Sequence, residues 1–442
     1  MLLEFKVSNY KSIGEEQIIS LIPATQQKEH PQNIITRGKY QALNAISIYG
    51  PNGSGKSNLL SSMSLLDELI HLSGRSSSTS KLPYDPFLLR EGWESKPTEF
   101  EISFVIGEDR YRYGLKFNAT EIVKEWLFRK ATGREVNLFQ REGDVIDVSS
   151  GFNTNGSKKL IGPAIEATRK NALFLSMCDV LNIEEAKSII KWFKNFNSVD
   201  GLSTDGEEMQ TVSLWDDEEF RGKIKKYITS LSLNIVDIDI STKEFDESEL
   251  PDDMPSGIRT QLIKTLKGKQ GYSVISKHNV YAEDAKPTGK THSWKWEERE
   301  SSGAKQAFQL SGPILWALDK GGVLIIDEIE AKLHPIMTLN TIDAFLDVKS
   351  NPKNAQLIFA THDTNLLSCS KLRRDQIYFA EKNKWESTET YSLSDFVYFG
   401  QKNGEPISEK ERPDTDKEKR YFEGRYGAIP ALGDFQKFIR NT

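Results

Sequence analysis

One stretch of the sequence restricts the fold more than any other, because it joins a short apolar segment to a helical pattern through a glycine-rich loop. Residues 50 to 58 read GPNGSGKSN and fit the pattern G-x-x-x-x-G-K-[ST]. The segment before the loop, Ala45–Tyr49, is apolar enough for a buried strand. Apolar residues after the loop recur at helical spacing, at Leu59, Leu60, Met63, Leu66 and Ile70. The order strand, glycine loop, helix predicts an α/β fold built around a phosphate-binding loop.

The residue types of this loop suit contact with phosphate. Gly50, Gly53 and Gly55 allow the backbone to curl and to direct its N–H groups at phosphate oxygens. The helix that follows adds the positive end of its dipole. The ammonium group of Lys56 can reach the β- and γ-phosphates of a nucleotide, and the hydroxyl of Ser57 can bind Mg²⁺.

A second Gly-Lys-Thr sequence, at residues 289 to 291, does not complete the pattern. The first glycine of such a loop would stand at position 284, which is Asp284. We therefore expect one phosphate-binding loop in the chain.

A pair of carboxylates follows a second buried-strand pattern. Residues 323 to 326 read VLII, and Asp327 and Glu328 come directly after them. Beside a phosphate-binding loop, Asp327 is expected to hold Mg²⁺. Glu328 is expected to orient or deprotonate the attacking water.

A third apolar strand is predicted at Gln356–Ala360, and it ends at Thr361-His362-Asp363. Residues at the carboxyl ends of parallel strands point into the crevice where α/β sheets bind ligands, so His362 is placed to hydrogen-bond a γ-phosphate. A purely structural histidine is the alternative.

A further anion site is suggested at Ser302 and Gly303, where a helical pattern begins. An ordinary Ser-Gly turn is the alternative there.

Composition restricts the class of protein. The 442-residue chain carries a formal net charge of -6, which argues against a protein built mainly to coat nucleic acid. Its two cysteines, Cys178 and Cys369, form no C-x-x-C pair, which suits a reducing cytosol. The sequence contains no run of about 18 apolar residues, so we expect a cytoplasmic protein without a membrane span.

The remaining patterns predict the organisation of the chain. Leu3, Phe5 and Val7 alternate as a first strand, and residues 98 to 148 alternate as an antiparallel β lobe. Helical patterns follow at 183–196 and 215–228, and no heptad run is long enough for a coiled coil. We expect three domains: residues 1–160 as the first half of a nucleotide-binding head with the β lobe, 161–260 as a helical lobe, and 261–442 as the second half.

Taken together, these segments resemble the ABC-type ATPase heads of the RecF and SMC kind. The resemblance rests on FKVSNYKSI from Phe5, GPNGSGKSN, ESSGAKQ as a variant of the LSGGQ signature, and LIIDEIEAKLHP with LIFATHD. Within that group the chain looks most like the ATPases of bacterial abortive-infection and anti-phage systems, of the AbiL/RloA type or the PARIS type. The late segment YFEGRYGAIP, residues 421 to 430, strengthens that match.

The resemblance implies an α/β ABC-type head with a mixed sheet and helices, an antiparallel β lobe and an inserted helical lobe. It implies that ATP lies between two heads, with Mg²⁺ on Ser57 and Asp327. Ser302 and Gly303 of the second head would complete the site, Lys56, Glu328 and His362 would act in catalysis, and Asn9, Tyr10 and Lys11 would lie near the nucleotide. The first head would bind ATP through Gly50, Pro51, Asn52, Gly53, Ser54, Gly55, Lys56, Ser57 and Asn58. Ala304 and Lys305 depart from the usual signature, which weakens the expected contact across the heads.

Three hypotheses follow for the function. The first is an ATP-driven switch of an anti-phage system that assembles as a dimer or larger ring and controls a partner effector. The segment after His362 shows no carboxylate cluster of a Toprim nuclease domain, so a nuclease activity would belong to that partner. The second is a RecF-like repair ATPase that binds DNA in a salt-dependent way. The third is a nucleotide-binding scaffold that hydrolyses almost no ATP. DNA or a phage component is the other partner considered for the first.

Overall fold

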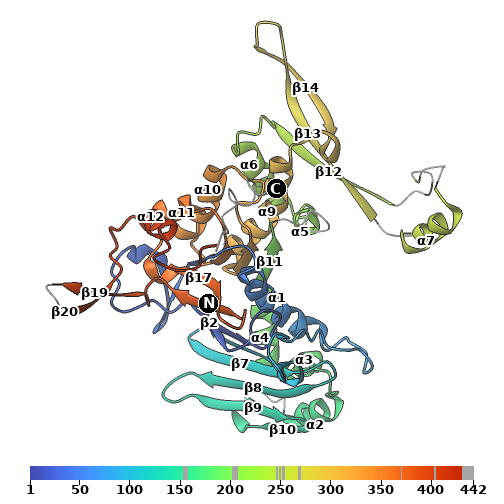
Figure 1. Ribbon diagram of the computed structural model, residues 1–442. Coiled ribbons are helices and arrows are strands. Elements are labelled where there is room, and N and C mark those ends of the chain that lie inside the picture. Colours follow the sequence, from blue (N-terminus) through green and yellow to red (C-terminus); the bar gives the residue numbers. More distant parts are fainter. Residues whose placement is uncertain are drawn as a thin grey trace, which may run out of the picture. The chain divides into compact units, whose positions relative to one another are not determined.

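The computed structural model describes residues 1–152, 158–201, 208–244, 247, 250, 254–266, 270–369, 371–402 and 405–430 (Figure 1). The chain divides into two compact units. The first contains Met1–Gly201, Trp316–Glu330 and Thr338–Thr442, and the second contains Leu202–Leu315 and Ala331–Met337. The segment 161–260 crosses the boundary at Gly201 and contains strands as well as helices. The sequence of residues 246–253 is acidic and contains a proline, which indicates a solvated loop; six of these eight residues lie outside the described ranges.

A six-stranded sheet carries the glycine loop of the first unit. Its order is β11 (Phe196–Asp200), β15 (Val323–Asp327), β16 (Gln356–Ala360), β5 (Ala45–Tyr49), β17 (Ile377–Lys382) and β18 (Thr388–Ser392). The first five strands are parallel, and β18 pairs antiparallel with β17. β5 and β16 are buried at every position, as parallel strands covered on both faces require.

The second sheet of this unit is entirely antiparallel and has seven strands, of which β7 to β10 are teal and the N-terminal strands blue in Figure 1. Its order is β10 (Val145–Val148), β9 (Val136–Glu142), β8 (Ile122–Lys130), β7 (Asp109–Phe117), β6 (Thr98–Ile106), β1 (Leu2–Ser8) and β2 (Gln17–Ser20). The expected β lobe is thus confirmed, and the N-terminal strand β1 joins it through antiparallel pairing with β6.

Helices complete the first unit. They are α1 (Lys56–Leu72), α2 (Lys158–Ala167), α3 (Phe174–Val180), α4 (Glu184–Phe193), α11 (Asn365–Ser368) and α12 (Lys417–Phe422), and α10 (Pro335–Leu346) belongs to it from Thr338 onward. The buried residues of α1 recur at helical spacing and join one core with both sheets. Two hairpins, β3–β4 (Ile34–Arg37, Tyr40–Leu43) and β19–β20 (Val397–Lys402, Glu405–Lys410), also belong to this unit and were not predicted.

The second unit has its own core around Trp215, Trp296 and Phe308. It consists of α5 (Glu208–Ser213), α6 (Glu218–Ser230), α7 (Ser256–Leu266), α8 (Trp296–Arg299), the first part of α9 (Ser302–Lys320) and a three-stranded sheet of β12 (Asp237–Glu244), β13 (Gln270–Tyr281) and β14 (Pro287–Lys295). The second Gly-Lys-Thr sequence lies in β14, an exposed strand, which confirms that it forms no phosphate-binding loop.

The late segment of residues 421 to 430 packs against β17. The ring of Tyr421 stacks on Phe379 with ring centroids 5.7 Å apart, and Tyr426 lies 5.3 Å from the same ring. The backbone N–H of Ala428 donates to Glu381 Oε2 at 2.7 Å. These contacts fix the segment beside the strand that follows β5 in the sheet.

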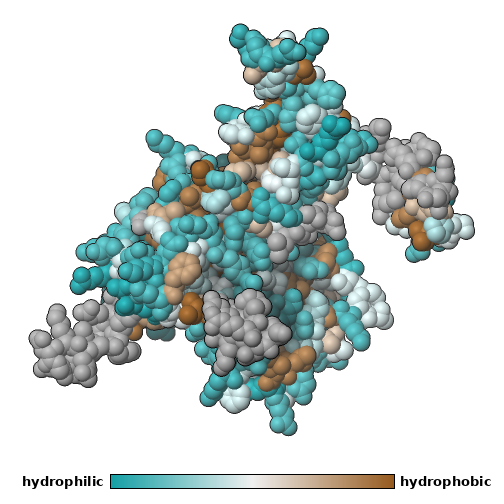
Figure 2. Space-filling model, turned by 45° about the horizontal axis from the view of Figure 1, so that its top comes forward, coloured by the Kyte–Doolittle hydropathy of each residue, from teal (hydrophilic) through white to brown (hydrophobic). Residues whose placement is uncertain are grey.

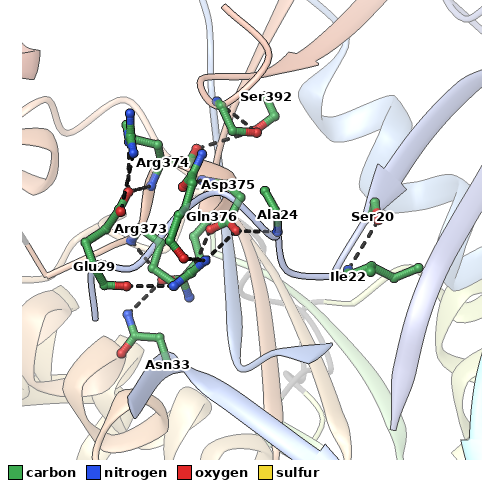
Figure 3. A network of polar contacts seen from close by, with 12 residues as sticks. Ser20, Ile22, Ala24, Glu29, Asn33, Arg373, Arg374, Asp375, Gln376 and Ser392 are labelled. Atoms are coloured by element: carbon green, nitrogen blue, oxygen red, sulfur yellow. Dashed lines mark hydrogen bonds and ion pairs between the residues drawn. The ribbon is translucent and has the colours of Figure 1, made fainter. Parts of the chain in front are cut away.

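A buried polar network at the start of β17 ties the early chain to the late chain (Figure 3). Arg373 is fully buried and donates to both carboxylate oxygens of Asp375, at 2.9 and 2.8 Å. It also donates to the backbone oxygen of Glu29 at 2.6 Å, and Asp375 accepts from the N–H of Ala24 at 2.8 Å. Residues 24 to 29 are thereby fixed by hydrogen bonds to residues far away in the sequence.

Removing the charge of Arg373 should therefore destabilise the first unit strongly. In Arg373→Met, the Asp375 carboxylate stays buried without its cation, which costs about 3–5 kcal/mol. Urea unfolding measures the change. The exposed pair Arg425–Glu423 supplies the matched control, since Arg425→Met should cost under about 1 kcal/mol. Equal costs for the two variants would contradict the role given to the network.

None of the helices in the described ranges is long and apolar enough to span a bilayer. The face drawn in Figure 2 is mostly hydrophilic, with hydrophobic residues in small separate groups.

Candidate nucleotide-binding site

Three neighbouring parallel strands bring the predicted site residues together. The glycine loop follows β5, Asp327 ends β15, and His362 follows β16, which lies between those two strands. The carboxyl ends of parallel strands meet at one edge of a sheet, where α/β proteins bind ligands. The first unit therefore gathers these three segments at a single place.

The glycine loop has a backbone that side chains would disturb. Gly53 and Gly55 have φ values of 77° and 102°, in the region that favours glycine. A Cβ atom on Gly50 would lie 2.2 Å from the backbone oxygen of Ala380, and one on Gly55 would lie 2.0 Å from Thr388 Oγ1. The glycines thus serve both conformation and close packing.

Thr388 is a residue of the site that the sequence patterns did not reveal. Its hydroxyl is fully buried, donates to the backbone oxygen of Ser54 at 2.8 Å and lies 2.9 Å from Ser12 Oγ. Asn58 donates to the same Ser12 oxygen at 2.8 Å. Ser12, in the loop after β1, and Thr388, on β18, therefore both support the glycine loop. Only the three-dimensional fold brings these two residues together.

Lys56 lies almost buried, with 5% of its surface exposed, beneath the loop. Its ammonium donates to the backbone oxygen of Gly50 at 2.8 Å and to that of Pro51 at 3.3 Å. Burial lowers the pKa of Lys56, and the nearby carboxylates, led by Asp327, oppose the change. The loop thus holds a cation within reach of anything bound to its N–H groups.

Ser57 and Asp327 form the pair expected to hold a metal. Burial raises the pKa of the Asp327 carboxyl, and the neighbouring Ser57 side chain opposes that change. Asp327 Oδ1 is buried and has no hydrogen-bond partner among the described residues. Hydroxyl and carboxylate oxygens are the ligands that Mg²⁺ prefers, usually one or two from the protein together with phosphate oxygens and water. The pair fits Mg²⁺ on this chemistry, while the described chain contains no larger cluster of metal-ligating side chains.

Glu328 adopts an unusual backbone conformation. Its φ of 50° lies in the left-handed region, which is uncommon outside glycine. Gly201 supports this turn, because its N–H donates to the backbone oxygen of Asp327 at 2.8 Å. Burial, and after it the charge of Asp327, raises the pKa of the Glu328 carboxyl. A carboxylate with a raised pKa at a solvent-accessible position suits a general base.

Gly201→Ala should impair any chemistry that depends on these carboxylates. An added Cβ would lie 2.4 Å from the backbone oxygen of Glu328 and 2.7 Å from that of Asp327, so the turn would have to move. A displacement of about 1 Å can cost about 100-fold in rate, and we expect kcat of that chemistry to fall at least about tenfold. In the control Gly222→Ala, on helix α6, an added Cβ has open space around it, so activity should be unchanged. An active Gly201→Ala variant would contradict this account.

His362 is exposed, and its backbone is held by a neighbouring carboxylate. The N–H of His362 donates to Glu330 Oε1 at 2.6 Å. Partial desolvation of the ring, and after it the charge of Lys56, lowers the pKa of His362, which favours the neutral imidazole. On the other side of the loop, Glu418 of α12 accepts hydrogen bonds from Thr364 Oγ1 at 2.9 Å and from Ser368.

Ser302 and Gly303 belong to the second unit and are not among the residues that the first unit gathers. They begin α9, where the Ser301 hydroxyl accepts from the N–H of Ala304 at 3.1 Å. A Cβ on Gly303 would lie 2.9 Å from the backbone oxygen of Lys332. The turn before the helix is fixed by Glu300, whose Oε1 accepts from side chains of β13 and β14, namely Ser276, His278 and Trp294.

The loop after β1 has mainly structural contacts. Asn9 is buried, and its amide donates to backbone oxygens of Trp93 and Lys96 at 3.2 and 2.6 Å. The hydroxyl of Tyr10 lies 3.3 Å from Ser61 Oγ on α1. Of this loop, Ser12 touches a residue of the glycine loop, Asn58.

The glycine loop and the carboxylate and histidine segments, at one edge of a mainly parallel sheet, define a P-loop protein with a mixed α/β fold, which confirms the predicted α/β class. The chain belongs to the family described as "AAA domain, putative AbiEii toxin, Type IV TA system", whose model matches residues 46–368. A search of curated proteins finds no match.

Several solved structures resemble the chain. One is an SMC head bound to the C-winged helix domain of ScpA, with 15% identity and a TM-score of 0.38, covering 88% of this chain and 97% of that one. Another is the recombination mediator RecF with ATPrS in the RecFOR pathway, with 12% identity and a TM-score of 0.29, covering 88% and 98%. A third is RecF with ATP, with 14% identity and a TM-score of 0.29, covering 81% and 93%.

Proposed function

We propose that this protein binds and hydrolyses ATP with Mg²⁺ and acts as a switch of a bacterial anti-phage system. The observation that carries the proposal is the group of polar atoms at the carboxyl edge of the six-stranded sheet. Tyr49 OH, Ser54 Oγ, Asp327 Oδ1 and Glu330 Oε2 are all buried and lack hydrogen-bond partners within the described part of the chain. Buried polar groups are normally paired, and such a group at one place indicates a site for a polar ligand.

Different residues of the site have different roles in the proposed hydrolysis. The N–H groups of residues 50 to 58 and the ammonium of Lys56 bind the phosphates and neutralise charge that develops on them. Ser57 and Asp327 would hold Mg²⁺, which supplies further charge stabilisation when bound. Glu328 takes a proton from the attacking water, and neutral His362 donates a hydrogen bond to the γ-phosphate. ATP and water yield ADP and phosphate.

We place the switch between two copies of the chain. Ser302 and Gly303 at the start of α9 would bind the ATP held by the partner copy, so that a dimer, or a larger ring, closes on ATP and opens after hydrolysis. A ligand that binds only the closed state shifts the population toward it. Slow hydrolysis would lengthen the closed state and the signal that it gives.

The biological role rests on the family. Its description names a putative toxin of a toxin–antitoxin system. We propose that this chain acts in the cytoplasm, in an anti-phage system of the AbiL/RloA or PARIS type, and that it controls a partner effector with nuclease activity. The trigger would be a phage component or DNA.

The proposal is tested by measuring the mass in solution of the wild type and of Glu328→Gln, each with and without ATP·Mg²⁺. We expect ATP to increase the mass, and Glu328→Gln to retain the larger species. An unchanged mass that corresponds to one chain would overturn the two-copy switch. Salt-dependent DNA binding that strengthens with ATP, in the absence of any effector, would instead favour a RecF-like repair ATPase.

A further inference from the structure

Glu330 connects the two loops that carry the proposed catalytic groups. It lies two positions after Glu328, on the loop that follows β15, while its Oε1 accepts the backbone N–H of His362 on the loop that follows β16, at 2.6 Å. Hydrogen bonds with an ionised acceptor are short and strong. This contact is therefore a direct link between the carboxylate loop and the histidine loop.

The backbone supports this link. The N–H of Ile329 donates to the backbone oxygen of Ala360 at 3.2 Å, which brings the chain just before Glu330 beside the end of β16. Ile329 is buried with 1% of its surface exposed, so the loop cannot turn away without exposing it. The Glu330 side chain is thus held where the histidine loop begins.

The other carboxylate oxygen of Glu330 gives a second observation. Glu330 Oε2 is buried and has no hydrogen-bond partner in the described ranges. The hydroxyl of Tyr49, the residue directly before the glycine loop, is also buried and also lacks a hydrogen-bond partner there. The charge of Glu330 also raises the pKa of Tyr49, after burial and the charge of Asp363. Glu330 therefore lies within electrostatic reach of the strand that enters the glycine loop as well.

We infer that Glu330 is a positioning residue for His362, one that sets where the imidazole stands relative to the nucleotide held by the glycine loop. The inference rests on the proposed ATP hydrolysis. Glu330 does not act as the base in this scheme; it accepts one N–H, and an amide oxygen can accept the same hydrogen bond. The charge of Glu330 is thus dispensable, whereas its acceptor oxygen and its length are required.

Steady-state hydrolysis of five proteins tests the inference: the wild type, Glu330→Ala, Glu330→Gln, His362→Ala and the double variant Glu330→Ala/His362→Ala. Loss of the acceptor should lower kcat about 10- to 100-fold with KM for ATP nearly unchanged, because misplacement affects the transition state more than ground-state binding. Glu330→Gln should stay within about threefold of the wild type. The double variant should be no slower than His362→Ala, since a residue that acts through another adds nothing once that one is gone.

Three outcomes would overturn the inference. Glu330→Gln as inactive as Glu330→Ala would show that the charge itself acts. Additive losses in the double variant would show that Glu330 works independently of His362. A raised KM with an unchanged kcat would assign Glu330 to ground-state binding. Glu166→Ala, which removes an exposed carboxylate of α2, controls for loss of charge.

Amide hydrogen exchange keeps this test separate from that of the proposed function. The peptide containing the N–H of His362 should exchange faster in Glu330→Ala than in Glu330→Gln, because only the first variant loses the acceptor. This readout needs no ATP turnover. A wild type that hydrolyses no ATP would refute the proposed function, whereas equal exchange in the two variants would refute the positioning role.

Discussion

Glu328→Gln should nearly abolish ATP hydrolysis while leaving ATP binding intact. The substitution keeps the size and hydrogen-bonding capacity of the side chain but removes its ability to take a proton. General base catalysis contributes about 10²–10⁴-fold, and we expect kcat to fall by that factor. The ammonium of Lys56 and the N–H groups of the glycine loop, which supply the binding of ATP, remain in this variant. The Kd for ATP should therefore change by less than about threefold.

Phosphate release and ATP titration of the same samples measure the two effects. Glu166→Gln, on the exposed face of α2, is the matched control and should retain full activity. Wild-type turnover in Glu328→Gln would refute the assignment of the base and favour a nucleotide-binding scaffold. Loss of binding together with turnover would show that Glu328 supports the site structurally, through its left-handed turn.

The first unit of this protein shows how far a sequence can predict a site. The glycine loop and the carboxylate and histidine segments were predictable because each follows a strand whose apolar residues are contiguous. The strand order β15, β16, β5 then brings the three segments together, as parallel sheets require. The antiparallel lobe was predictable for a similar reason, since alternation over β6 to β9 is a local property.

Other parts of the site depend on packing between distant residues. Thr388 stands in a polar strand, and nothing in its neighbours indicates that it will support Ser54. Gly201 supports the backbone of Asp327 and Glu328 because β11 pairs in parallel with β15, and a single glycine gives no sign of that register. Glu330 left a weak signal as a third acid in the DEIE sequence. Its bond to His362 could be known only from the fold.

Lys56→Met should weaken ATP binding strongly, whereas the stability of the nucleotide-free protein should stay the same or rise. The ammonium is nearly buried, and burial lowers the pKa of Lys56, so the apo protein holds this cation at a cost. Burying a charge costs free energy, and an apolar side chain of similar length removes that cost. The melting temperature of the variant without nucleotide should therefore equal or exceed that of the wild type.

With ATP the order should reverse. Truncating a buried, hydrogen-bonded charge that meets an opposite charge costs about 2–5 kcal/mol, which weakens binding about 30-fold to several thousand-fold. The rise in melting temperature that ATP·Mg²⁺ gives the wild type should vanish, since that rise depends on ligand concentration relative to Kd. Lys290→Met, in the exposed second Gly-Lys-Thr sequence, should behave as the wild type in both measurements. An ATP-dependent rise that survives in Lys56→Met would show that the glycine loop does not hold the phosphates. A lower melting temperature without nucleotide would show instead that the hydrogen bonds of Lys56 to Gly50 and Pro51 outweigh the cost of its burial.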